Sequence, residues 1–573
     1  MAFSGNDAEG FRFDGFDSGT PNKKEKKPFS TAKRVAINVA VTLLVAAVVF
    51  YVELPAINPH SLGFYFYLLL LCGVYCFCAL LTSGHRGGAG EYFRFFKKQC
   101  TVPFYLAVLL VAIVLVGSLA GSTVLRANRY AKLLTITAGD FAEEVEEISY
   151  SQIPMLDRAS AERLGDRKLG ELSDMVSQFE VADDYIQINY QGRPVRVASL
   201  LYADAIKWLS NRRDGLPAYL MIDMVTQNVE LVRLEEGIHY TTAEHFGRNL
   251  YRYLRFHYPT FLFDDPVMEI DEEGTPYWIC PRLVKTIGLF DGTDVKGAVL
   301  VNAITGESQY WEEVPTWVDH LHSAELIIQQ YDYYGMYHNG FLNSIFGQKD
   351  VTVTTDGYNY IAINDDVYVY TGITSTGGDQ SNIGFILTNQ RTKETKFYSC
   401  AGATEYSAMA SAEGELQNLR YAATFPLLLN VGGEATYFMA MKDDAQLVKK
   451  YAMVNVQQYQ VVATGDTVAE CEKNYVDLLG QNGIVIGERS TGTTGQAEGT
   501  IAEIRSAVRE GNTYYYFRLE GHTVFYTISA VNAPIAVILN VGDQVAITYS
   551  RDTTVLSSVE PPAIWDAVAI ERR

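Results

Sequence analysis

The densest group of side chains able to bind a metal ion or transfer protons lies near the middle of the chain. Asp319, His320 and His322 stand within four residues, and Glu325 follows. Such side chains hold zinc only when they converge on one point. We expect residues 315–334 to form a helix, on which positions two apart point to different sides. The sequence therefore predicts no metal here, and instead the solvated start of a helix.

Two acidic turns have the oxygen-rich composition that calcium prefers. One contains Asp291 and Asp294, and the other is formed by Asn364, Asp365 and Asp366. Neither has the ordered series of ligands that an EF-hand loop supplies. We interpret both as exposed polar turns, with weak extracellular calcium binding as the alternative.

A basic stripe supplies the candidate binding residues, His245, Arg248, Arg252 and Arg255. The arginines are spaced i, i+4 and i+7, so a helix would place them on one face together with His245. In an acidic body this stripe fits an anionic envelope polymer, a lipid headgroup or an acidic protein surface. The alternative is a solvated helix face that pairs with nearby carboxylates.

No pattern of a familiar catalytic site occurs in the sequence. There is no Gly-x-Ser-x-Gly elbow, no His-Glu-x-x-His, no phosphate-binding Gly-rich loop with Lys-Ser/Thr and no dinucleotide fingerprint. The seven cysteines include no Cys-x-x-Cys pair. We therefore predict a non-catalytic protein without a cofactor. The alternative is an envelope hydrolase or transferase that uses scattered carboxylates such as Asp365, Asp366 and Asp379.

Three apolar stretches determine where these residues lie in the cell. Val35–Val52, Leu62–Thr82 and Val102–Ser122 each approach the ~20 residues that cross a bilayer, and none contains Asp, Glu, Lys or Arg. Ion and proton pathways normally need ionisable groups inside the membrane. The three spans at 35–122 therefore favour an anchor, with an accessory subunit of a transporter as the alternative.

Basic residues predict the orientation of these spans. The tail at 1–34 and the loop between the second and third spans are rich in Lys and Arg, whereas the loop ELPAINPHS has neither. The tail is therefore predicted to be cytoplasmic, and everything after Ser122 to lie outside the plasma membrane. Through Gly121 the chain has 11 Lys and Arg against 7 Asp and Glu, and afterwards 35 against 60. This acidic body argues against nucleic acid as a partner.

A short phrase recurs in the body. Its copies are LMIDMVTQNVELV at 220–232, VLVNAITGESQYW at 299–311, ILTNQRTKETKFY at 386–398, and a weaker copy around Asn455. Asp or Asn pre-forms a turn at the same position of each copy, and Gly306 supplies a permissive backbone. Lys393 replaces that glycine, so its turn must differ or be strained.

A second phrase and intervening helices repeat in the same order. The second phrase reads EGTPYWICP at 273–281, DGYNYIAIN at 356–364 and GEATYFMAM at 433–441. We expect helices over 241–259, with Thr241 and Glu244 at capping-box spacing, over 315–334, and over 403–426. The pattern predicts duplicated modules, each a helix on an antiparallel sheet, over 201–485. Residues 123–200 are predicted to form a helical stalk or adaptor.

This order resembles PepSY-like modules, which have a cystatin-like fold. The residues that carry the resemblance are Tyr277, Trp278, Val299, Leu300, Val301, Asn302, Thr305, Gly306 and Glu307. The copy at 358–360 and 386–395 departs from the pattern by losing the glycine. The whole chain also resembles a group of bacterial multi-pass membrane proteins. The resemblance implies an extracytoplasmic, non-catalytic module that binds or restrains other proteins, sometimes proteases, and it brings no catalytic residues.

The C-terminal region is predicted to be a separate domain. Residues 486–499 read as a Gly/Thr-rich linker. Residues 500–573 alternate in the manner of about five short strands, typical of a small β-barrel similar to OB or SH3-like folds. The sequence thus predicts a membrane-anchored α+β protein. Its modules are expected to bind another envelope protein or an anionic envelope polymer, as a scaffold, sensor or regulator.

Overall fold

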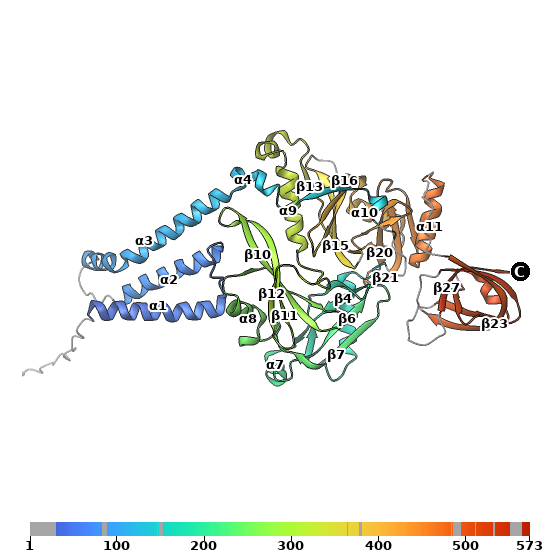
Figure 1. Cartoon of the computed structure of the whole chain (residues 1–573), viewed down its shortest axis with the longest axis horizontal. Helices are drawn as coiled ribbons and strands as arrows, with labels where there is room; N and C mark the ends of the chain where they lie inside the picture. The colour runs from blue at the N-terminus through green and yellow to red at the C-terminus, as the bar shows by residue number, and fades with distance from the viewer. Residues whose placement is uncertain are drawn as a thin grey trace, which may run out of the picture. The chain divides into compact units, whose positions relative to one another are not determined.

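The chain divides into two compact units, Met1–Val116 and Gly117–Arg573 (Figure 1). The structure is a computed structural model. It describes residues 30–82, 89–145, 147, 153–363, 365–377, 381–482, 484, 494–509, 512–530, 533–550 and 564–573. Of the predicted cytoplasmic tail, residues 1–29 lie outside the described residues.

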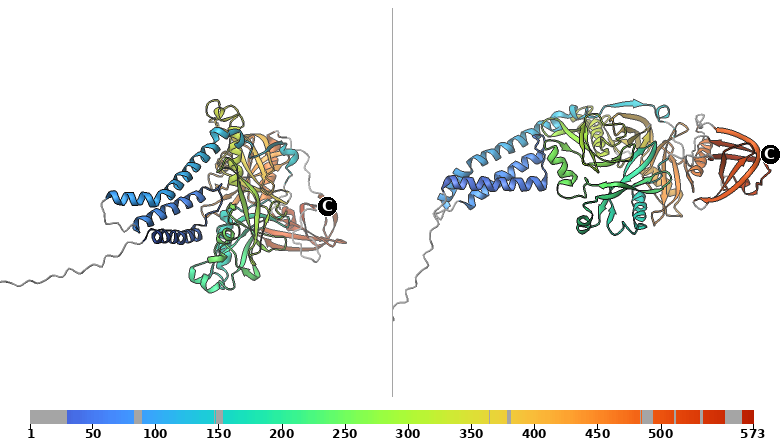
Figure 2. Two further views of the ribbon diagram at one scale, coloured as in Figure 1. Left: turned by 60° about the vertical axis from the view of Figure 1, so that its left-hand side comes forward. Right: turned by 60° about the horizontal axis from the view of Figure 1, so that its bottom comes forward.

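Three long apolar helices begin the described chain, as predicted, and each is long and apolar enough to cross a membrane. They are α1 (Thr31–Glu53), α2 (Leu62–Leu81) and α3 (Ala89–Gly121), of which Phe96–Gly121 is the candidate span. α1 and α2 lie side by side (Figure 2). The Thr82 hydroxyl at the end of α2 donates a hydrogen bond to Asn38 Oδ1 at 2.9 Å. This contact satisfies a polar side chain that a bilayer would leave without water.

Four antiparallel sheets follow along the chain of the second unit, and their main strands adopt the same order. Each is a meander of four strands in sequence order, and in three of them a short extra strand pairs with the second. A helix precedes each sheet along the chain. We call each helix with its sheet a module and number the modules from 1 to 4.

The modules have the following elements. Module 1 contains α6 (Arg158–Gly170), β3 (Ile186–Tyr190), β4 (Arg193–Ala198), β6 (Leu216–Asp223) and β7 (Val229–Ile238). Module 2 contains α8 (Leu250–His257), β8 (Leu262–Phe263), β9 (Val267–Ile270), β10 (Pro276–Ile287), β11 (Asp291–Asn302) and β12 (Ser308–Trp311). Module 3 contains α9 (Ala324–Tyr337), β13 (Thr352–Thr354), β14 (Asn359–Ile363), β15 (Asp366–Ser375), β16 (Ser381–Asn389) and β17 (Thr395–Ala403). Module 4 contains α10 (Glu405–Glu415), β18 (Ala422–Ala423), β19 (Leu427–Val431), β20 (Glu434–Lys442), β21 (Val448–Asn455) and β22 (Val462–Gly465).

Shorter elements connect and extend the modules. They are α4 (Thr123–Tyr130), β1 (Ile136–Gly139), α5 (Phe141–Glu144), β2 (Phe179–Val181), β5 (Leu200–Tyr202), α7 (Ala205–Asn211), η2 (Phe246–Arg248), η3 (Asn343–Gly347) and α11 (Val468–Gln481). β1 adds to the edge of the module 3 sheet by pairing in parallel with β17. The predicted helical stalk over 123–200 is therefore wrong, because this stretch alternates short helices with strands and contains the start of module 1.

The modules are packed in two pairs, each with its own apolar core. One core joins the sheets of modules 1 and 2 around Trp278, which is 1% exposed. The other joins modules 3 and 4 around Tyr370 and Tyr437, which are 0% and 1% exposed. Each sheet thus covers its most apolar face with the sheet of its pair, and other faces remain available for contacts between the pairs.

One turn recurs in all four modules, and its first residue is Asp223, Asn302, Asn389 or Asn455. In each turn the side-chain Oδ1 accepts hydrogen bonds from the backbone N–H groups two and three residues later, at 2.7–3.0 Å. An Asx side chain that does this pre-forms the turn and sets the register of the hairpin. The repeated phrase in the sequence therefore marks four equivalent hairpins.

The fifth residue of this turn has left-handed backbone geometry in modules 1, 2 and 3. The φ angles are +58° at Gln227, +76° at Gly306 and +65° at Lys393. The backbone N–H of Lys393 donates to the Asn389 carbonyl at 2.8 Å, and the equivalent bond in module 2 measures 2.9 Å. The turn at Lys393 is therefore the same turn, held in a conformation that is strained for a residue other than glycine.

The second repeated phrase is out of register in one copy. Residues 273–281 and 433–441 fall on the second main strand of their sheets, β10 and β20, whereas 356–363 fall on the first, β14. The strand equivalent to β10 in module 3 is β15, which pairs with β16 as β10 pairs with β11. Tyrosines occur both at the start of this phrase, at 358 and 360, and in β15, at 368 and 370, so the phrase at 356–363 matches the other copies in composition and not in position.

The C-terminal region forms its own apolar core inside a closed ring of strands (Figure 2). Its elements are β23 (Thr494–Arg509), β24 (Asn512–Leu519), β25 (Phe525–Ser529), η4 (Pro534–Ile538), β26 (Gln544–Ser550) and β27 (Ile564–Arg572). β23 pairs with both β24 and β26, and a parallel pair of β25 with β27 completes the ring. The predicted linker at 486–499 ends earlier than expected, because β23 begins at Thr494; residues 486–493 lie outside the described residues.

We expect Gln227→Gly to raise the free energy of unfolding by about 1 kcal/mol, because glycine removes most of the cost of left-handed geometry. Lys393→Gly removes the same strain but also an ion pair, in which Lys393 Nζ lies 2.6 Å from Asp294 Oδ1. We therefore expect no gain from it. Thermal unfolding of the full chain in detergent measures both variants, and an equal gain in both would contradict a role for the ion pair.

Candidate functional site

A cavity of about 1080 Å³ lies between the two pairs of modules. Residues from all four modules line it, among them Arg196 on β4, Val267 on β9, Tyr360 on β14 and Phe438 on β20. Pockets for small organic ligands have volumes of roughly 300–1,000 Å³, so this volume slightly exceeds that range. We call it the central cavity and treat it as the candidate functional site.

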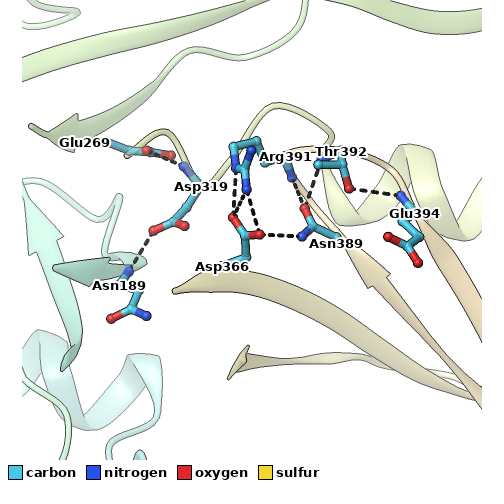
Figure 3. A network of polar contacts seen from close by, with 8 residues as sticks. All are labelled: Asn189, Glu269, Asp319, Asp366, Asn389, Arg391, Thr392 and Glu394. Atoms are coloured by element: carbon cyan, nitrogen blue, oxygen red, sulfur yellow. Dashed lines mark hydrogen bonds and ion pairs between the residues drawn. The ribbon is translucent and has the colours of Figure 1, made fainter. Parts of the chain in front are cut away.

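A buried carboxylate, Glu269 on β9, organises one wall of the central cavity. It accepts hydrogen bonds from the backbone N–H groups of Asp319 and His320, both at 2.8 Å, and it contacts the His320 ring Nδ1 at 3.0 Å. Asp319 Oδ2 in turn accepts a hydrogen bond from the backbone N–H of Asn189 at 2.7 Å (Figure 3). Asn189 lies on β3, so the segment that leaves module 2 is bonded to the sheets of modules 1 and 2.

The predicted solvated helix over 315–334 is wrong in its first part. α9 begins only at Ala324, and Asp319, His320 and His322 are 1%, 8% and 7% exposed. The physical reason is that the Glu269 carboxylate takes the backbone N–H groups of residues 319 and 320, which holds this segment in a non-helical path.

Burial changes the protonation of these groups. Desolvation and the neighbouring Glu269 raise the pKa of Asp319 well above its ordinary value. Desolvation and the charge of Lys393 lower the pKa of His322 to about 4, so this ring is neutral at neutral pH. In the part of the chain that the structure describes, no group of three or more His, Cys, Asp and Glu side chains is placed to hold a metal ion.

The first predicted acidic turn is part of a contact between modules. Asp294 Oδ1 accepts hydrogen bonds from Lys393 Nζ at 2.6 Å and from Gln330 Nε2 at 3.4 Å. Desolvation raises the pKa of Asp291, and the charge of Lys285 opposes that shift. The ammonium group of Lys393 already neutralises Asp294, so the geometry does not support calcium binding there.

The second predicted acidic turn is likewise neutralised by the protein. Asp366 forms a bidentate ion pair with Arg391, at 2.8 and 2.7 Å, and also accepts a hydrogen bond from Asn389 (Figure 3). Asp365 is exposed with a φ of +68°. Asn364 and Asp379 lie outside the described residues. Both oxygens of Asp366 are already occupied by Arg391 and Asn389, so the geometry does not support the hydrolase alternative at Asp366.

The structure distributes the four predicted binding residues over two elements. His245 precedes η2, Arg248 ends it, and Arg252 and Arg255 lie in α8 after Asn249. Each arginine donates to a backbone carbonyl: Arg248 to Arg212 at 2.8 Å, Arg252 to Phe246 at 2.9 Å and Arg255 to Phe261 at 2.8 Å. Desolvation lowers the pKa of Arg255. They do not form a stripe on one helix, and their role in binding stays a prediction.

The predicted capping box of this region is wrong. α8 begins at Leu250 with Asn249 as its N-cap. Glu244 is 2% exposed and accepts hydrogen bonds from the Tyr202 hydroxyl at 2.7 Å and from the Trp208 indole at 2.8 Å. Its carboxylate therefore joins α7 and β5 to this segment and does not begin a helix.

Three polar residues of the central cavity were missed by the sequence reasoning: Asp184, Gln187 and Arg196. Arg196 is 6% exposed, and desolvation lowers its pKa to about 10. Desolvation raises the pKa of Asp184 to about 6. A signal for Arg196 was present, because it interrupts the apolar strand PVRVA, and charged residues are seldom buried without a partner.

Comparisons with known proteins do not identify the chain. No family model matches the sequence, and no curated protein matches it. Among solved structures, a point mutant of levansucrase from B. megaterium has a TM-score of 0.17 and 8% sequence identity; the alignment covers 75% of this chain and 92% of that chain. A likeness at this score carries no argument about fold or function.

We expect Asp184→Asn to raise thermal stability at about pH 8 and to have little effect at about pH 3.5. Because the folded-state pKa of Asp184 lies above its unfolded value, the folded state binds more protons between these two values. Stability is therefore lost as the pH rises from about 4 through 6, by up to about 3 kcal/mol, and asparagine removes this loss.

Thermal unfolding measured across this pH range tests the expectation. Asp183→Asn is the matched control, because the neighbouring Asp183 is exposed, and we expect it to change little. A stability difference between Asp184→Asn and the parent that does not vary with pH would contradict the assignment.

Proposed function

We propose that this protein is a membrane-anchored, non-catalytic binding protein of the cell envelope. It acts as a scaffold, sensor or regulator, and its central cavity receives the ligand. One observation carries the proposal: residues of all four modules line a single cavity of about 1080 Å³. A ligand bound there contacts both pairs of modules, so it favours one arrangement of the pairs over others. Sensors and regulated scaffolds need this property.

The placement outside the plasma membrane draws support from the basic residues around the spans. The loop between the first two helices has no Lys or Arg, whereas the tail and the next loop have several. Three spans then place the second unit outside. Another envelope protein or an anionic envelope polymer remains the proposed macromolecular partner, and the basic residues Arg248, Arg252 and Arg255 are its proposed contact.

The fold of the modules supports a PepSY-like, cystatin-like interpretation. Each module has a helix, followed by a meander whose last hairpin contains the Asx turn. For the C-terminal ring, an OB-like interpretation is favoured over an SH3-like one, because the long first strand pairs with two neighbours and a parallel pair completes the ring. Such barrels are platforms, and their fold alone names no ligand.

We expect Ala159→Trp to abolish ligand binding, because Ala159 is exposed in the first turn of α6 and lines the central cavity. The indole would occupy space that the ligand needs. The measurement is the thermal shift of the full-length protein in nanodiscs when small-molecule fractions of an envelope extract are added.

Ala469→Trp is the matched control for this variant, because Ala469 is exposed on α11 and does not line the cavity. We expect one and the same extract fraction to stabilise the parent and Ala469→Trp. We expect this fraction not to stabilise Ala159→Trp. Equal shifts in all three proteins, or no shift in the parent, would overturn the proposed function.

We expect a cysteine introduced by Asn228→Cys to react with a membrane-impermeant maleimide in intact cells, because Asn228 is exposed on the second unit. A cysteine from Arg94→Cys, in the region predicted to be cytoplasmic, should react only after permeabilisation. The native cysteines of this chain are buried or half-buried, so their background is low. The opposite pattern of labelling would reverse the proposed orientation.

A further inference from the structure

Arg196 is a buried cation in the central cavity that forms no ion pair within 4.0 Å among the described residues, although the charge of Asp157 acts on it from a longer distance. Its guanidinium donates to the carbonyls of Tyr185 at 3.0 Å and Leu156 at 3.4 Å. No carboxylate oxygen of the described chain lies within 4.0 Å of it. A guanidinium has five N–H donors in a planar fork, and two carbonyls use only part of them. A buried charge that is incompletely paired is costly to the fold, so a ligand that completes the pairing would be bound strongly.

Gln187 is the cross-strand neighbour of Arg196. The two residues pair directly in the β3–β4 ladder, so their side chains lie on the same face of the sheet. This face is opposite the one whose Val195 and Val197 enter the core of modules 1 and 2. Gln187 is 2% exposed, and its Nε2 has no hydrogen-bond partner in the described structure. The cavity therefore contains a second buried donor that is unused, directly beside the guanidinium.

Module 3 supplies the opposite side of this pair of donors. Tyr360 on β14 lies near Arg196, and its ring packs edge to face against His320, with the two ring centroids 5.8 Å apart. Burial keeps the Tyr360 hydroxyl protonated by raising its pKa. The Tyr360 hydroxyl already interacts with Tyr358, so the guanidinium and the amide are the donors available to the two oxygens of a carboxylate.

The remaining charges of the cavity restrict the ligand further. Seven lining residues are Asp or Glu, and two are Arg. Lys442 is unavailable, because its ammonium contacts both oxygens of Asp157 at 2.7 Å. A phosphate dianion would need a second free cation and would be repelled by this acidic wall. Asp184 adds a half-buried carboxylate whose Oδ1 has no hydrogen-bond partner in the described structure. The wall therefore favours a ligand with a positive group.

We infer that the central cavity binds a zwitterion of the amino-acid or short-peptide class. Its carboxylate lies against Arg196 and Gln187, beside Tyr360, and its ammonium group lies against the acidic wall that includes Asp184. This inference rests on the proposed function of the cavity and names the chemistry of its ligand.

The test uses full-length protein in nanodiscs and native mass spectrometry. The probes are an equimolar library of free dipeptides that covers all twenty side chains, the same library N-acetylated, and the same library C-amidated. We expect free dipeptides to bind, and each modification to weaken binding on the order of ten- to hundredfold, the effect of losing one charge-assisted interaction.

Variants assign each end of the ligand. Arg196→Gln should abolish the preference for a free carboxylate, and Asp184→Asn should reduce the preference for a free ammonium group. Arg196→Lys keeps the charge without the fork and should bind with intermediate affinity, which separates recognition from folding. Arg233→Gln is the matched control, because Arg233 is an exposed arginine paired with Asp174 outside the cavity; it should bind as the parent does.

The outcomes separate this inference from the proposed function. If no free dipeptide binds, or if amidated and free libraries bind equally, the zwitterion assignment is overturned. If an extract ligand still stabilises the parent but not Ala159→Trp, the proposed function stands even though the zwitterion assignment has failed. If dipeptides bind equally to the parent and to Ala159→Trp, the zwitterion assignment is overturned, because binding then occurs outside the cavity, and the extract measurement alone decides the proposed function.

Discussion

The arrangement of the modules depends on one buried carboxylate, that of Glu269. Its side chain is 0% exposed, and a carboxyl group so placed is tolerated only when hydrogen-bond partners surround it. The donors come from the chain that leaves module 2, at Asp319 and His320. That segment is thereby held along the wall of the central cavity, where Asp319 reaches module 1 at Asn189 and His320 reaches module 3 at Tyr360. A single buried carboxyl group thus links the three modules that enclose Arg196 and Gln187.

Within this arrangement, the register of the strands determines which residues can face the cavity. An Asx turn with the same hydrogen bonds closes the last hairpin of each sheet and sets its register. A slip by one residue on β3 or β4 would exchange the two faces of the sheet and direct Arg196 into the apolar core of modules 1 and 2. The register that keeps Val195 and Val197 in the core therefore also keeps Arg196 in the cavity. Packing and recognition depend on the same constraint.

Features that depend on local chemistry are predictable from this sequence, whereas features that depend on contacts between distant residues are not. The three apolar helices follow from composition alone, and the hairpins follow from Asp or Asn at the start of a turn. The helix predicted over 315–334 failed because the group that prevents it, Glu269, lies 50 residues from Asp319. The capping box failed for the same reason, since Glu244 is bound by Tyr202 and Trp208. Most of the candidate site was therefore invisible, although the arginine inside the strand PVRVA was a usable signal.

A cavity with unused polar groups needs a physical justification, because the same fold would be more stable with apolar residues there. Buried donors without partners, such as Gln187 Nε2, cost about 1–3 kcal/mol each, and an incompletely paired guanidinium costs more. Well-packed apolar side chains of similar volume commonly remove such costs. A scaffold whose role was only to hold its parts together would gain from that replacement. When several buried polar groups lack partners and lie together in one cavity, the expected reason for their destabilising placement is function. Binding a ligand that supplies the missing acceptors would restore this stability and, because the cavity lies between the two module pairs, would also stabilise their relative arrangement.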